Sequence, residues 1–280
     1  MAINLINAGY PLHCYNRTPS KAQSVIEAGG KYFSTPQEAA RDASIILVMV
    51  TDGPDVEKVL FGEDGALQAA PSGALILVMS TISPQMNRDL AARAGALGFR
   101  MIDAPVSGGD VGAQRGTLSI MAGGNETDIA EAMPVFQVLG ETITHCGPVG
   151  SGQVVKLCNQ ICGALNLLGV CEALSLGTKN GIDPEILIRV ISGGAGNSWA
   201  MEHLAAKIAN GDWAPGFMVD TQQKDMRLVA EMAAQTQTPL PGAALTTQLW
   251  QAAQAQDCGS EGIQSLAKVL FALAKIDSKK

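Results

Sequence analysis

Two short apolar segments constrain the fold of this 280-residue chain more than any other feature of its sequence. Residues 44–50 and 74–79 are runs of Ile, Leu, Val and Met with almost no polar residue inside them. Such runs are typical of parallel strands that are buried on both faces of a sheet. Stretches long enough for helices separate the strand-like segments, so the pattern predicts βαβ units and a doubly wound parallel sheet.

The pattern changes near residue 147, and this change predicts two domains. Before it, shorter strands are expected at residues 12–15, 31–33, 99–103 and 117–121, and helices at 19–28 and 35–41. After it only helices are expected, at residues 153–180, 184–191, 198–209, 221–235, 240–255 and 261–275. We therefore expect an α/β domain over residues 1–147 and an all-helical domain over residues 148–280.

Composition limits the functions open to the chain. A formal net charge of −7 argues against nucleic acid as a partner. There is no uninterrupted apolar run of about eighteen residues, so no membrane span is expected, and the first residues lack the basic start of a signal peptide, which predicts a cytoplasmic location. The cysteines form no C-x-x-C pair and the histidines no cluster, so we expect buried, reduced thiols and no metal site. The cysteines are Cys14, Cys146, Cys158, Cys162, Cys171 and Cys258.

The most informative functional segment is the glycine-rich start of the longest predicted helix. Glycines at 147, 150 and 152 precede Lys156 and Asn159, which are three residues apart and so project from one face of a helix. The residues around Lys156 are almost all apolar, and a lysine there is costly unless it is paired or functional. An acid–base lysine with an orienting amide is one interpretation; an exposed pair on a solvated face is the other.

Two loops that follow predicted strands have the composition of ligand-binding turns. Residues 16–18 (Asn-Arg-Thr) lie where dinucleotide-binding folds carry an acid for a ribose hydroxyl or an Arg for a 2′-phosphate, and here Arg17 and Lys21 supply positive charge. Residues 107–109 (Ser-Gly-Gly) follow another strand and have the composition of an anion nest suited to a carboxylate. Turns without any ligand are the alternative at both places.

Five segments, in this order, resemble the β-hydroxyacid dehydrogenase family over essentially the whole chain. They are Asn16-Arg-Thr, Asp103-Ala-Pro-Val-Ser-Gly-Gly, Gly116-Thr-Leu-Ser-Ile-Met, Gly150-Ser-Gly-Gln-Val-Val-Lys-Leu-Cys-Asn, and Pro215-Gly-Phe with Gln223-Lys-Asp. The resemblance implies an N-terminal Rossmann domain for NADP(H), with NAD(H) as the alternative cofactor, and a helical domain for substrate binding and dimerisation. The long helix is most similar to that of the tartronate semialdehyde (2-hydroxy-3-oxopropionate) reductase branch.

The resemblance also implies roles for individual residues. Lys156 matches the catalytic lysine, which protonates the developing alkoxide while hydride reaches the aldehyde carbon. Substrate contacts are implied for Ser107, Gly108, Gly109 and Asn159, and cofactor contacts for Asn16, Arg17, Thr18, Thr81 and Lys224. The implied reaction is the NADP(H)-dependent reduction of a small aldehyde acid to a hydroxy acid, or its reverse. Separately, the apolar faces of the predicted C-terminal helices indicate a homodimer or homotetramer.

The chain departs from the family at its start. The family begins with a strand and a Gly-x-Gly-x-x-Gly turn, whereas residues 1–10 match the first helix, so about fifteen residues are missing by comparison and weak NADPH binding is expected. Alternative functions are 3-hydroxyisobutyrate dehydrogenase, glyoxylate or succinic semialdehyde reductase, and an inactive truncated homologue that binds no cofactor. A relative of 6-phosphogluconate dehydrogenase is disfavoured, because Asn159 stands where that family has a His.

Overall fold

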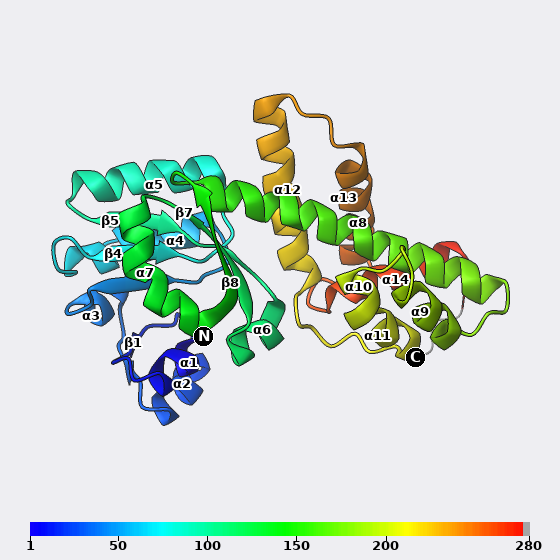
Figure 1. Ribbon diagram of the computed structural model, residues 1–280, viewed down its shortest axis with the longest axis horizontal. Coiled ribbons are helices and arrows are strands. Elements are labelled where there is room, and N and C mark those ends of the chain that lie inside the picture. Colours follow the sequence, from blue (N-terminus) through cyan, green and yellow to red (C-terminus); the bar gives the residue numbers. More distant parts are fainter. Residues whose placement is uncertain (277–280) are drawn as a thin grey trace. The chain divides into compact units, whose positions relative to one another are not determined.

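The structure is a computed structural model that describes residues 1–276, and the chain divides into two compact units, Met1–Lys156 and Leu157–Lys280. The first unit contains α1 (Ala2–Asn7), β1 (His13–Cys14), η1 (Pro19–Ala22), α2 (Gln23–Glu27), β2 (Lys31–Tyr32), α3 (Pro36–Ala40), β3 (Ile45–Val48), α4 (Gly53–Phe61), η2 (Ala66–Gln68), β4 (Leu75–Val78), α5 (Pro84–Ala96), β5 (Arg100–Asp103), β6 (Val106–Ser107), α6 (Gly109–Arg115), β7 (Leu118–Gly123), α7 (Glu126–Leu139) and β8 (Gly140–Gly147). The long helix α8 (Ser151–Lys179) begins in this unit and continues into the second (Figure 1).

The first unit is built on a mixed sheet. Its strands lie in the order β3-β4-β5-β7-β6, with β8 also beside β7, while β1 and β2 form a separate parallel pair. The β3–β4, β4–β5 and β7–β8 pairs are parallel, and β5–β7 and β6–β7 are antiparallel. The α/β prediction is therefore confirmed, with antiparallel pairing added around β7.

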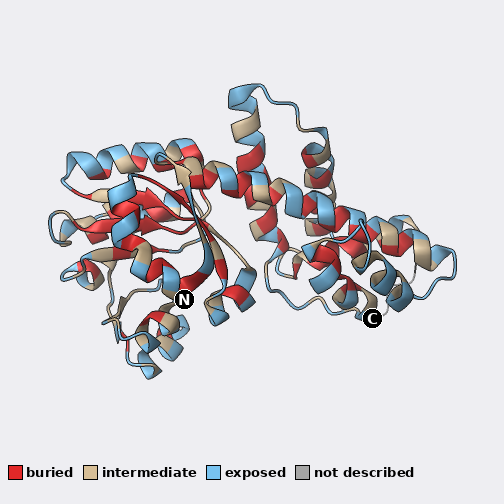
Figure 2. Cartoon of the chain, viewed as in Figure 1, coloured by how far each residue is buried: buried red, intermediate tan, exposed pale blue. Residues whose placement is uncertain are grey.

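Strand β4 explains how the sheet is covered on both faces. Leu75 and Leu77 belong to an apolar cluster with residues of α1 and α7, whereas Ile76 and Val78 belong to a second cluster with residues of α4 and α5. All four side chains are fully buried, and Figure 2 shows this part of the sheet in red. Burial of each is worth about 2 kcal/mol, so alternate residues of one strand hold a helix layer on each face of the sheet.

Strand β3 corrects one expectation. Residues 44–50 do not form a strand buried on both faces, because Ile46 and Val48 are buried while Ile45 and Leu47 are only partly covered. Met49, just beyond the strand, is 51% exposed. The reason lies in position: β3 is the last strand of the described six-stranded sheet and has a neighbouring strand on one side only. An apolar run predicts a strand but does not reveal its place in the sheet.

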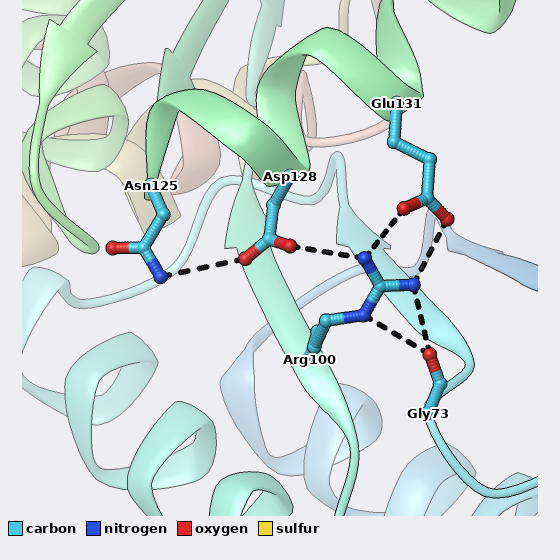
Figure 3. A network of polar contacts seen from close by, with 5 residues as sticks. All are labelled: Gly73, Arg100, Asn125, Asp128 and Glu131. Carbon is cyan, nitrogen blue, oxygen red and sulfur yellow. Dashed lines mark hydrogen bonds and ion pairs between the residues drawn. The ribbon is translucent and has the colours of Figure 1, made fainter.

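At the amino end of β5, Arg100 joins three parts of the first unit (Figure 3). Its guanidinium donates to Asp128 Oδ1 at 3.1 Å, to both carboxylate oxygens of Glu131, and to the carbonyl oxygen of Gly73 at 2.9 and 3.1 Å. Asn125 Nδ2 approaches Asp128 Oδ2 at 3.5 Å. The network ties α7 and the turn before β4 to the start of β5, and it keeps the pKa of Glu131 below its ordinary value, chiefly through the hydrogen bond from Arg100.

The second unit is helical in its described part. After α8 it contains α9 (Pro184–Ser192), α10 (Trp199–His203), α11 (Ala205–Asn210), α12 (Val219–Thr236), α13 (Pro241–Gln254), η3 (Ile263–Ser265) and α14 (Leu266–Leu273). The helix expected at residues 198–209 is two helices, separated at Leu204, whose buried side chain belongs to the unit's apolar core. Trp250 of α13 is fully buried in the same core.

Two cysteines of helix α8 contradict the expectation that the thiols are buried. Buried thiols are found at Cys171 and Cys258, but Cys158 and Cys162 are exposed, because positions 158 and 162 lie on the side of α8 away from the core residues Leu157 and Ala164. All six cysteines are unbridged. By length and composition α8 is apolar enough to cross a membrane, but it also supplies Leu157, Leu167 and Leu174 to the core of the second unit.

Candidate functional site

A cavity of about 590 Å³ in the first unit brings together the residues predicted to bind the cofactor's ribose end. Asn16, Arg17 and Thr18 line it, directly after β1. The other lining residues are Tyr15, Lys21, Ser34, Thr35, Pro36, Met49, Val50, Thr51, Asp55, Lys58, Val59, Gly62, Glu63 and Asp64. Ligand pockets are usually about 300–1,000 Å³, so the cavity has the size for the adenosine end of a dinucleotide.

The shape of this turn follows from its sequence. Asn16 Oδ1 accepts a hydrogen bond from the Thr18 backbone N–H at 2.9 Å, an Asx turn, and Pro19 then starts η1. The side chain of Arg17 is 81% exposed and lies 3.6 Å from Asp55 Oδ1. Since such an exposed ion pair is worth at most about 1 kcal/mol, a phosphate can compete for Arg17.

Lys156, the predicted catalytic residue, is only 6% exposed although it carries an ammonium group. It lies one turn after the start of α8, with Leu157 fully buried beside it. The solvated-face interpretation is therefore wrong for this lysine. Its burial is that of a group with a specific partner or task.

Ser107, Gly108 and Gly109 form the end of β6 and the first residue of α6. Ser107 pairs with Ser119 of β7, which fixes its place in the sheet. Gly108 has φ of +133° and Gly109 of +61°, conformations that side chains rarely adopt, and a Cβ at position 108 would come within 3.1 Å of Leu118 Cδ2. The backbone here therefore requires glycine, as a nest of N–H groups would.

In the second unit, Asn159 and Lys224 belong to one chain of polar contacts. Asn159 Nδ2 donates to Gln160 Oε1 at 3.0 Å, and Gln160 Nε2 donates to Asp225 Oδ2 at 2.6 Å. Lys224 Nζ lies 2.7 Å from Asp225 Oδ1. Gln160 and Asp225 are buried, so this chain connects a predicted substrate contact with a predicted cofactor contact. The sequence predicted no role for Gln160 or Asp225, although the Gln223-Lys-Asp motif contains Asp225.

Thr81 is partly exposed and lies in the loop after β4, between two residues that contact α8. The backbone N–H of Ile82 donates to Gln153 Oε1 at 3.0 Å, and Gln153 Nε2 donates to the carbonyl of Ser80 at 2.8 Å. One side chain therefore clasps the peptide groups on both sides of Thr81. Gln153 is a further residue that the sequence did not single out.

Comparison with known proteins shows the family of the chain. Residues 1–147 match the NAD binding domain of 6-phosphogluconate dehydrogenase, and residues 150–270 match the NAD-binding domain of NADP-dependent 3-hydroxyisobutyrate dehydrogenase. The fold and both matches define the chain as a nicotinamide-dependent oxidoreductase. It belongs to the 3-hydroxyisobutyrate dehydrogenase family and is an NAD(P)-dependent 3-hydroxyacid dehydrogenase, which confirms the resemblance in the sequence.

Individual relatives cover most of the chain. The chain is 37% identical to 2-hydroxy-3-oxopropionate reductase of Escherichia coli over 89% of this chain and 85% of that protein. It is 34% identical to 3-hydroxyisobutyrate dehydrogenase of Pseudomonas aeruginosa over 94% of this chain and 91% of that protein. The solved structure of the Mycobacterium tuberculosis 3-hydroxyisobutyrate dehydrogenase with L-serine matches with a TM-score of 0.85 and 31% identity, over 96% of this chain and 94% of that one.

Proposed function

We propose that this dehydrogenase reduces a small aldehyde acid of the tartronate semialdehyde type with NADPH, or catalyses the reverse oxidation, with Lys156 as general acid or base. The observation that carries the proposal is Lys156 itself, an almost fully buried lysine one turn into the glycine-led helix α8. Homology to 2-hydroxy-3-oxopropionate reductase supports this substrate class.

The cofactor supplies and accepts hydride when bound, and the residues of the cavity fit its adenosine end. Arg17, Lys21 and Lys58 line the cavity and offer cationic groups to a 2′-phosphate. Asp55, Glu63 and Asp64 line it too, so the acidic and basic side chains of the cavity balance. In the proposal, the preference for NADP(H) therefore depends on direct contact between Arg17 and the 2′-phosphate rather than on the net charge of the cavity. In the proposal Asn16 and Thr18 shape the turn, and Thr81 and Lys224 contact the cofactor elsewhere.

Lys156 carries the proton. As the carbonyl carbon of the aldehyde gains hydride, its oxygen becomes an alkoxide, and the Nζ ammonium donates a proton to that oxygen and is left as a neutral amine. In the oxidation the neutral amine takes the hydroxyl proton. We assign the substrate carboxylate to the backbone at Ser107, Gly108 and Gly109, and the orientation of the substrate or of Lys156 to the Asn159 amide.

The test is a steady-state assay of the purified protein with NADPH and NADH. Tartronate semialdehyde, methylmalonate semialdehyde, succinate semialdehyde and glyoxylate form the panel, and Lys156→Met is the variant, since it keeps the length of the stem without the charge. We expect the highest kcat/KM with tartronate semialdehyde and NADPH, and a loss of kcat of about 10²–10⁴-fold in the variant. Turnover of Lys156→Met within a few-fold of the parent would remove the proposed role.

We also propose that the protein is a homodimer or homotetramer. In the second unit, α8 and α14 leave a shallow apolar groove in which Leu176 and Leu273 are 69% and 74% exposed. Exposed apolar side chains that gather on one surface are typical of subunit contacts. Light scattering should give a mass of two or four chains, and Leu176→Glu with Leu273→Glu should lower it; a monomeric parent contradicts the proposal.

A further inference from the structure

A buried carboxylate holds the start of the helix that carries Lys156. Asp103, at the end of β5, is fully buried, and Oδ1 accepts from the Gly150 N–H at 2.6 Å while Oδ2 accepts from the Gln153 N–H at 2.9 Å. Asp103 has no ion pair within residues 1–276. The first backbone N–H groups of a helix are the natural partners of such a charge, so Asp103 acts as a cap supplied from 47 residues earlier in the chain.

The close fit of the backbone around Asp103 is visible at two glycines. A Cβ at Gly123, the residue of β7 that pairs with Asp103, would come within 2.7 Å of Oδ1. A Cβ at Gly152 would overlap the carbonyl oxygen of Met121 and come within 2.8 Å of Oδ2. β5, β7 and α8 therefore meet at this carboxylate with no room for a side chain.

The place where β5, β7 and α8 meet at Asp103 is called the junction below, and Gln153 connects it to the loop after β4. Its backbone N–H binds Asp103, and its side chain binds Ile82 N and Ser80 O on both sides of Thr81. The Ser80 hydroxyl in turn accepts from the Val50 N–H at 2.7 Å. The carboxyl ends of β3, β4 and β5 are thus connected to the first turn of α8, whose next turn carries Lys156.

We propose that Asp103 and Gln153 are positioning residues, which set where Lys156 and Thr81 stand relative to each other. The proposal rests on the proposed roles of these two residues as proton donor and cofactor contact. Lys156 follows Gln153 by three residues of a rigid helix, about 4.5 Å along its axis, so fixing Gln153 fixes the backbone of Lys156. Proton and hydride must arrive at neighbouring atoms, and a displacement of about 1 Å can cost about 10²-fold in rate.

Such a junction is distinguishable from a merely structural cap. Asp103 holds only the start of α8, whereas Gln153 holds α8 and the Thr81 loop together. Asp103→Asn should therefore lower kcat and leave KM for NADPH unchanged. Gln153→Met should lower kcat and also raise KM for NADPH, because Ile82 N and Ser80 O lose their partner.

The experiment compares these variants with Asp42→Asn and Gln137→Met, which make the same changes at exposed positions of the same unit. Expected results are a fall in kcat of about 10–100-fold in both junction variants, a rise in KM for NADPH of several-fold in Gln153→Met alone, and control values equal to the parent. Amide exchange of the protein without cofactor should be faster at residues 150 and 153 in Asp103→Asn, and faster at Ile82 in Gln153→Met.

Lys156→Met, measured in parallel, separates the two proposals. If it remains active, the proposed function fails whatever the junction variants do. If it is inactive while both junction variants match their controls, or if KM for NADPH rises equally in both, the positioning role is refuted. Should Asp103→Asn not fold, Gln153→Met decides alone: a fall in kcat together with a raised KM for NADPH in a folded protein supports the role, and any other pattern contradicts it.

Discussion

Gly152→Ala tests the junction at the start of α8 by a single methyl group. The added Cβ would overlap the carbonyl oxygen of Met121 and press on Asp103 Oδ2, so the carboxylate or the helix must move. Two hydrogen bonds to a charged acceptor are then strained, from Gly150 N and from Gln153 N. Each such bond is worth about 1.5–3 kcal/mol, and the gain from replacing glycine is about 0.4–1 kcal/mol. Loss of both bonds would therefore lower the free energy of unfolding by about 2–6 kcal/mol.

Gly169→Ala is the matched control, because it changes the same residue type on the same helix. A Cβ at Gly169 meets no atom within 4 Å, and the position is exposed, so this change should stabilise α8 by about 0.5–1 kcal/mol. The two substitutions are therefore expected to have opposite signs.

The assay is urea unfolding followed by two signals. The tryptophans are Trp199, Trp213 and Trp250, all in the second unit, so their fluorescence reports on that unit, whereas far-UV circular dichroism reports on both. Gly152→Ala should shift the dichroism midpoint to lower urea by more than the fluorescence midpoint. Equal midpoints for Gly152→Ala and Gly169→Ala would refute the argument that the backbone at the junction has no room.

Three further outcomes follow from the fold and the sites. Arg17→Ser should raise KM for NADPH by about tenfold more than KM for NADH, since the guanidinium serves the 2′-phosphate; equal changes contradict the assignment. Arg100 lowers the pKa of Glu131, so the stability that this contact adds is present above the ordinary pKa of 4.5 and is lost as the pH falls. The difference in unfolding free energy between the parent and Arg100→Met should therefore shrink below that pH, and a difference that stays constant would contradict the prediction. Cys158 should react with a thiol reagent within minutes, whereas Cys171, whose pKa burial raises, should react only on unfolding; equal rates would contradict the described burial.

Local patterns predicted much of the fold. Thr35 and Ser83 each precede a proline, which is a local signal for the start of a helix, and both side chains accept a hydrogen bond from the backbone N–H three residues later. The continuous apolar run at residues 74–79 predicted the buried strand β4, and the glycine-rich segment before residue 153 predicted the start of α8 to within two residues.

What the sequence did not reveal lies at long range. Asp103 belongs to a motif that the sequence brought out, but its partners Gly150 and Gln153 lie 47 and 50 residues away. Gln160 and Asp225 are 65 residues apart, and neither residue type is unusual on the surface of a helix. Periodicity reports which residues share an element, and only the packing of elements decides which polar groups meet inside.

Strand β5 sets the distance between two attachment points in the first unit. It is four residues long, with Arg100 tied to α7 at one end and Asp103 tied to α8 at the other. Sliding this strand by one position would move both tied side chains to the opposite face and break both attachments at once. We therefore expect that natural variation in length avoids residues 100–103 and collects in the turns outside them, so that the spacing between these two anchors stays at three even where the residues between them change.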